Sequence, residues 1–162
     1  MKGKKIEFMT WVEAEVALAK TPFVSIPLGA RLKEHGPHLP LNNDWIIAER
    51  MTDWVLEDFE TLAIPTVQHG YYPAFVNYPG SVHIEMETSK NFISEIVQSF
   101  VRHGVNKFFI INTGVSTCWA LEPLRLDLLE SNIKMDYFDW FAVEGLNEHL
   151  EQAEGTHADE FE

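Results

Sequence analysis

Short apolar runs alternate with helix-forming segments along this chain, and this alternation constrains the fold more than any other feature. Four runs are predicted strands: residues 23–27, 62–67, 107–112 and 134–138. Four segments with helical spacing lie before and between them: residues 11–20, 45–59, 89–102 and 119–129. The order α-β-α-β-α-β-α-β predicts an α/β fold, a three-layer α/β/α sandwich with a mostly parallel sheet and helices on both faces.

Local signals place the ends of the helices. Thr10 is predicted to cap the first helix, and Asp44 to cap the helix over residues 45–59. Ser89 is predicted to open the third helix, and Gly104 fits its C-terminal stop.

Composition narrows the class of protein. A chain of 162 residues is expected to be a single domain with a substantial core. Its net charge of −13 argues against a nucleic acid or an anionic membrane as partner. The single Cys118 rules out an internal disulfide framework, and neither a signal peptide nor a membrane-crossing run is recognisable. These features predict a cytoplasmic location.

Three loops are expected at the C-terminal edge of the sheet, where α/β proteins place their chemistry: residues 28–44, 68–83 and 112–118. The first contains Glu34, His35 and His38, with Asp44 six residues beyond the second histidine. These oxygen and nitrogen donors suit a divalent ion such as zinc or manganese. The alternatives are that Lys33 and Glu34 are solvated charges, and that the histidines bond the backbone of a rigid Gly-Pro loop.

The other two loops carry weaker signals. The aromatic segment 71–78, with Tyr72 and Tyr78, either lines a substrate pocket or packs a loop or an oligomer interface. The segment 112–117 is small and polar, and its backbone amides could hold an anion or a developing oxyanion. Ser116 lacks a nucleophile-elbow sequence, and Cys118 is better explained as a buried helix residue. The closing segment 155–162 is either a frayed acidic terminus or a source of one more metal-binding carboxylate, Glu160.

Together these motifs resemble the creatininase family, metal-dependent amidohydrolases that open or cleave small, often cyclic amides. Four segments carry the resemblance: 27–30, 35–41 followed by Asp44, 78–81 and 157–162. The resemblance implies an α/β/α sandwich, two divalent metals bridged by water or hydroxide, and a homo-oligomer, commonly a hexamer. For this chain we expect one or two ions, zinc or manganese, with iron as a further option. Because family members are longer, it also predicts that residues 1–162 form one domain lacking its C-terminal part.

The resemblance also implies roles for individual residues. His35 matches a metal-binding histidine, Asp44 the aspartate that bridges two metals, and Glu160 an acidic metal ligand. The chain departs from the family pattern at two places. Lys33 stands two residues before His35, where the family usually has glutamate, and leaves Glu34 as the nearest replacement. The segment 112–117 is Asn-Thr-Gly-Val-Ser-Thr, so the histidine of the family's Asn-Gly-His-Gly-Gly-Asn is absent.

The first functional hypothesis is a metal-dependent amidohydrolase of the creatininase type, in which metal-activated water attacks the carbonyl of a small amide and a C–N bond other than a peptide bond is cleaved. His38 or Glu34 would move the proton. The expected substrate-binding residues are Tyr72, Tyr78, Thr113, Ser116 and His157. The rival hypothesis is a catalytically impaired relative that serves as a binding or structural module. A third option is a metal-dependent carbohydrate or lactone hydrolase, because the aromatic loop could stack on a sugar ring.

Overall fold

The computed structural model describes residues 2–139 and 142. Its strands are β1 (Lys4–Lys5), β2 (Val24–Leu28), β3 (Leu62–Ala63), β4 (Lys107–Asn112) and β5 (Lys134–Asp139). Its α-helices are α1 (Trp11–Leu18), α2 (Asn43–Asp58), α3 (Met86–Val101) and α4 (Cys118–Glu130). Two short 3-10 helices, η1 (Ile6–Phe8) and η2 (Pro73–Phe75), complete the described elements.

The strands form one sheet in the order β1-β3-β2-β4-β5, and every pairing in it is parallel. In the register, Leu28 at the end of β2 pairs with Asn112 at the end of β4, which in turn pairs with Asp139 of β5. The loops that follow β2 and β4 therefore leave the same edge of the sheet. The predicted α/β fold with a parallel sheet is confirmed.

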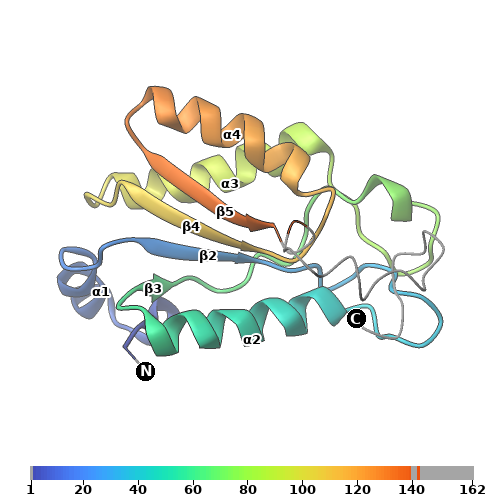
Figure 1. Ribbon diagram of the computed structural model, residues 1–162, viewed down its shortest axis with the longest axis horizontal. Coiled ribbons are helices and arrows are strands. Elements are labelled where there is room, and N and C mark those ends of the chain that lie inside the picture. Colours follow the sequence, from blue (N-terminus) through green and yellow to red (C-terminus); the bar gives the residue numbers. More distant parts are fainter. Residues whose placement is uncertain (1, 140–141, 143–162) are drawn as a thin grey trace.

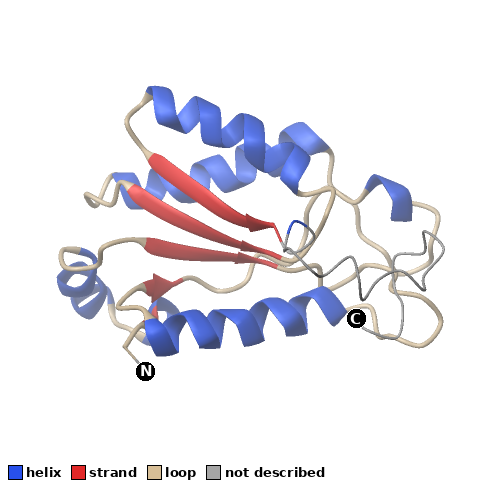
Figure 2. Cartoon of the chain, in the orientation of Figure 1, coloured by secondary structure: helices blue, strands red, loops and turns tan. Residues whose placement is uncertain are grey.

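Helices cover both faces of this sheet. Figure 1 shows α3 and α4 on one side of the sheet and α2 on the other. The layered arrangement of red strands between blue helices is also clear in Figure 2. The main apolar core lies between the sheet and the α3–α4 side. It contains Val24 and Ile26 of β2 and Ile110 of β4, all fully buried, together with residues of α3 and α4.

Several predicted boundaries were close to those observed. Thr10 caps α1 in a capping box with Glu13, and β4 has the predicted bounds. Gly104 adopts φ +88° just after α3, as expected for a glycine that stops a helix. The prediction that Ser89 opens α3 was wrong, because the helix begins at Met86 and Ser89 is buried within it.

Two further predictions need correction, each for a physical reason. Only Leu62 and Ala63 of the predicted strand 62–67 form β3, because Pro65 has no N–H to donate to a ladder. Val67 still makes an isolated bridge with Leu28. Asp44 does not cap α2, because that helix starts earlier, with Asn42 at the N-cap, and Asp44 lies in its buried first turn.

The close approach of α2 to the end of β2 depends on Gly29. A Cβ at this position would lie 2.5 Å from the Asp44 carbonyl oxygen and 2.7 Å from the Cβ of Ala48. The amide of Trp45 donates to the Ala30 carbonyl at 3.1 Å across the same contact. Glycine at 29 therefore allows the first turn of α2, with Asp44, to pack against the sheet edge.

No helix in residues 2–139 is long and apolar enough to cross a membrane.

Replacing Gly29 with alanine should push the first turn of α2 away from β2. We expect Gly29→Ala to lower the free energy of unfolding by about 1–3 kcal/mol, the usual cost of overpacking. Urea denaturation measures this change. The control is Gly104→Asn, since a Cβ there meets no atom within 4 Å and asparagine tolerates positive φ. Equal losses in the two variants would contradict the packing role of Gly29.

Candidate functional site

The three loops predicted to meet at the C-terminal edge of the sheet do so. The Thr113 hydroxyl lies 3.1 Å from the carbonyl oxygens of both Leu28 and Asp44, and so links the ends of β2 and β4 to the start of α2. The Ser116 hydroxyl donates to the Tyr71 carbonyl at 2.7 Å and connects the third loop to the second. This edge is the candidate functional site.

Three buried side chains form the centre of the site, and we call them the Lys33–Asp44–His35 group. The Lys33 Nζ lies 2.6 Å from one Asp44 carboxylate oxygen, Oδ2, and the His35 Nε2 lies 2.8 Å from the other, Oδ1. The side chains of Lys33 and Asp44 are each 6% exposed and that of His35 is fully buried. Both oxygens of the carboxylate are thus engaged by nitrogen atoms away from solvent.

His35 has the orientation of a metal-binding histidine. Its Nδ1 lies 2.8 Å from the backbone carbonyl oxygen of Lys33, and because a carbonyl only accepts, Nδ1 must carry the hydrogen. Its Nε2 then faces the Asp44 Oδ1 at 2.8 Å. Metal-binding histidines commonly donate one ring N–H to a carbonyl in the same way and direct the other nitrogen at the ion.

Electrostatics keeps Asp44 ionised. Burial alone raises the pKa of a carboxyl, but the hydrogen bond with His35 and the charge of Lys33 outweigh it. The pKa of Asp44 is therefore held below its ordinary value of 3.8.

The second loop contributes Tyr72, which lies against the same group. The Lys33 Nζ is 5.7 Å from the centre of the Tyr72 ring, and Tyr72 is 4% exposed. Burial and the nearby Asp44 charge raise the pKa of Tyr72, so its hydroxyl stays protonated. Tyr78, by contrast, is 49% exposed and contacts the Phe75 ring. The structure thus brings Tyr72 but not Tyr78 to the buried centre.

The third loop is held by Asn112, whose importance the sequence patterns did not indicate. Its side-chain amide donates to the Gly114 carbonyl at 2.8 Å, and its oxygen accepts from the Gly114 amide at 3.2 Å. The Thr113 amide donates to the Leu28 carbonyl. The amides of Thr113 and Gly114 are therefore already hydrogen-bonded within the protein, so they are not available to hold an oxyanion as predicted.

Cys118 is not prepared to act as a nucleophile. Burial and the neighbouring Asp139 charge raise the pKa of its thiol to about 11. The thiol is therefore neutral near pH 7, whereas the thiolate is the reactive form.

The described residues do not fit a divalent metal as they are arranged. Residues 2–139 contain no group of three or more His, Cys, Asp or Glu side chains that could hold an ion. His35 and Asp44 supply two donors, whereas structural and catalytic zinc sites use three or four protein ligands. The Lys33 ammonium adds a positive charge on one of the two donors.

Within residues 2–139, the other predicted site residues do not complete such a set. The Glu34 carboxylate accepts a hydrogen bond from the Gly36 amide within its own loop. His38 is exposed on a turn, so its role in proton transfer stays a prediction. Glu160 and His157 lie outside the described residues.

Lys33 is the functional residue that sequence reasoning missed. Treating it as a solvated charge was wrong, because it is 5% exposed and ion-paired. The available signal was its place two residues before His35, where the resemblance expects an acidic metal ligand.

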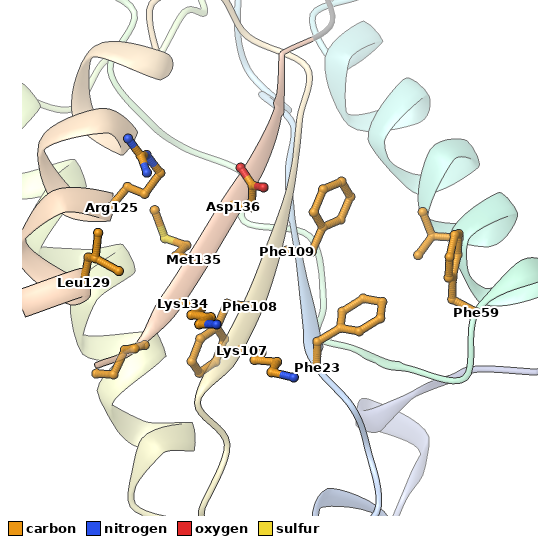
Figure 3. Close-up of a pocket in the computed structure, with 12 residues that line it drawn as sticks. Phe23, Phe59, Lys107, Phe108, Phe109, Arg125, Leu129, Lys134, Met135 and Asp136 are labelled. Atoms are coloured by element: carbon orange, nitrogen blue, oxygen red, sulfur yellow. The ribbon is translucent and has the colours of Figure 1, made fainter. Parts of the chain in front are cut away.

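A separate cavity of about 550 Å³ lies at the opposite end of the strands. Figure 3 shows Phe23, Phe59 and Phe109 around one side of it, near Lys107 and Lys134, the first residues of β4 and β5. Phe23 and Phe59 pack edge to face, with ring centres 6.3 Å apart. This cavity is therefore apart from the Lys33–Asp44–His35 group, which follows the C-terminal end of β2.

Comparison with known proteins identifies similar sequences. The model of the creatininase (creatinine amidohydrolase) family matches residues 7–162. The chain is 27% identical over 110 residues to a creatinine amidohydrolase of Pseudomonas putida, covering 64% of this chain and 42% of that protein. It is 35% identical over 69 residues to a mycofactocin precursor peptide peptidase of Mycolicibacterium smegmatis, covering 39% of this chain and 28% of the relative.

Solved structures show the same fold. A crystal structure of creatinine amidohydrolase (creatininase) matches with a TM-score of 0.77 at 22% identity, over 90% of this chain and 61% of the other. Manganese and zinc forms of creatininase match with TM-scores of 0.77 and 0.73 at 20% and 19% identity. They cover 92% of this chain, and 63% and 64% of their own lengths. The chain spans less than two thirds of each of these relatives.

Removing the Lys33 charge should destabilise the protein strongly, because it leaves Asp44 buried and unpaired. We expect Lys33→Met to cost about 3–5 kcal/mol of unfolding free energy, measured by urea denaturation. The matched control is Lys5→Met, which breaks the pair with Glu49 at 2.7 Å, where the side chains are 23% and 28% exposed. There we expect about 1 kcal/mol or less. A similar small loss in both variants would show that the buried Lys33–Asp44 pair stabilises the protein no more than the partly exposed Lys5–Glu49 pair.

Acid should remove the stabilisation that comes from Asp44. Its pKa is lowered on folding, so its contribution is present above the ordinary value of 3.8 and is lost as the pH falls through the lower folded value. We expect the unfolding free energy of the wild type to drop more steeply below about pH 5 than that of Asp44→Asn. Asp127→Asn, at an exposed pair with Lys90, should keep the wild-type slope. Parallel pH profiles for all three proteins would contradict this assignment.

Proposed function

This chain belongs to the creatininase family, and we propose that it is a hydrolase of the amidohydrolase type acting on a carbon–nitrogen bond of a small amide. The relatives that support this class are a creatinine amidohydrolase and a peptide peptidase. The observation that carries the proposal is the buried His35–Asp44 pair at the C-terminal edge of the sheet. His35 is fixed by the Lys33 carbonyl with its second nitrogen directed at the carboxylate.

We assign roles to the surrounding residues in keeping with their contacts. Thr113 and Ser116 donate to backbone carbonyls, so they act by holding the loops together around a substrate. Tyr72 and Tyr78 provide the aromatic side of the substrate site, the former buried and the latter exposed. His38, exposed on its turn, is the candidate for moving protons to and from solvent.

The metal is the part of this proposal that the described residues support least. A bound zinc or manganese ion supplies hydrolytic chemistry by activating water and polarising a carbonyl. Manganese and zinc forms are known among the structural neighbours. In residues 2–139, however, His35 and Asp44 are joined by no third donor, and Asp44 is paired with the Lys33 ammonium. We therefore assign no catalytic step to a metal ion.

The second candidate function is a binding module that recognises a small amide without hydrolysing it. The observation that favours it is the contact of the Lys33 Nζ with Asp44 at 2.6 Å. An ammonium neutralises the carboxylate but offers no site at which water becomes a nucleophile. In either case we propose a small molecule as the ligand and a homo-oligomer as the assembly.

One assay separates the two functions. The protein is incubated with creatinine, the amide named for one relative, and with a panel of small lactams, with and without added zinc or manganese. We expect hydrolysis, followed by chromatography, to fall about 100-fold or more in Asp44→Asn, because this variant loses the carboxylate at which His35 is directed.

Binding measured by calorimetry on the same samples decides the remaining cases. Binding without hydrolysis in the wild type would replace the first function by the second. If no amide is bound or cleaved, both are wrong.

A further inference from the structure

We propose that Lys33 is an internal competitor of divalent metal ions for Asp44. Its ammonium lies 2.6 Å from the Asp44 Oδ2, while His35 engages the Oδ1 of the same carboxylate. A metal held by His35 and Asp44 would have to share this carboxylate with a positive charge. The affinity of the site for a cation is therefore set by a residue that is not itself a ligand.

Burial makes this competition strong. The side chains of Lys33 and Asp44 are each 6% exposed, so little water screens their attraction or the repulsion between the ammonium and an arriving ion. A divalent ion can reach the Oδ2 only if the ammonium moves away. The free energy of the lost Lys33–Asp44 ion pair therefore lowers the affinity for the metal ion.

Lys33 is also held in place, unlike a surface lysine. Its Nζ lies 5.7 Å and 5.3 Å from the ring centres of Tyr72 and Phe75, within cation–π range. Its backbone amide donates to the Leu41 carbonyl at 3.0 Å. The two rings therefore oppose the displacement of the ammonium from Asp44, and the bond to Leu41 fixes the backbone from which the side chain extends.

The backbone and side chain of Lys33 have opposite effects on a metal. Its carbonyl accepts from the Nδ1 of His35 and keeps the other ring nitrogen directed at Asp44, which favours an ion. Its ammonium opposes an ion. Because a side-chain substitution leaves the carbonyl in place, it can remove the opposing effect and keep the orientation of His35.

The test measures zinc affinity in metal-stripped protein, by competition with a chromophoric chelator. We expect Lys33→Gln, whose amide can still donate to Asp44, to bind zinc about 10- to 100-fold more tightly than the wild type, the range typical of residues that act on metal ligands from outside the ligand set. The gain should disappear in the double variant Lys33→Gln, His35→Gln. If zinc were bound at other histidines, replacing His35 would not change its affinity.

The matched control is Lys5→Gln, since Lys5 also pairs with two carboxylates, Glu49 at 2.7 Å and Asp53 at 3.4 Å. It should leave zinc affinity unchanged. Equal zinc affinity of the folded Lys33→Gln variant and the wild type would overturn the proposal, as would a gain that survives loss of His35.

If zinc-free Lys33→Gln does not fold, its folding is followed by circular dichroism as zinc is added. Zinc should then restore the fold, because an ion at His35 and Asp44 replaces the missing charge of the lysine. No zinc-dependent folding of that variant would also overturn the proposal. The inference concerns metal affinity at the site of the proposed function and does not require hydrolysis. Amide cleavage is therefore scored separately, and either result can fail without the other.

Discussion

The ion pair between Lys33 and Asp44 is the interaction on which the rest of the site depends. A carboxylate that is 6% exposed is tolerated only when positive charge and hydrogen bonds compensate its lost hydration. Lys33 and His35 both reach it from the loop after β2, while Thr113 bonds the backbone carbonyl of the same residue from the end of β4. Lys33 and His35 therefore compensate the charge of the carboxylate, and Thr113 ties the backbone of Asp44 to the end of β4.

The sequence predicted the architecture well where periodicity was strong. The apolar run 107–112 is β4 with the predicted bounds, and the alternation of strands and helices gave the parallel sheet. The prediction from sequence failed where contacts between distant segments determine the secondary structure. Lys4 and Lys5 show no strand pattern, yet they pair with Leu62 and Ala63 as β1. The predicted start of α2 was two residues late, because the burial of Asn43 and Asp44 against the sheet edge at Gly29 is not visible in local propensity.

The candidate site was predicted in part for the same reason. The spacing of His35 and Asp44 predicted that both bind a metal, and this stays a prediction. The structure brings the two side chains to 2.8 Å from each other. The burial of Lys33 could not be predicted, because a lysine in a loop is ordinarily solvated and only the packing of Tyr72 and Phe75 around it makes it an interior charge. Asn112 was likewise taken as one residue of a polar turn, although its side chain fixes the conformation of that turn.

A cation supplied by the chain differs chemically from one taken from solvent. An ammonium and a divalent ion both offset the charge of Asp44, so either can satisfy the electrostatic requirement of the buried carboxylate. An ammonium, however, has three N–H donors and no coordination position, whereas zinc can keep one position open for water and lower its pKa. The residue at position 33 therefore separates two properties that a metal site combines. Lys33 supplies the stabilising charge within the fold, and hydrolysis through His35 and Asp44 needs a different source of activated water.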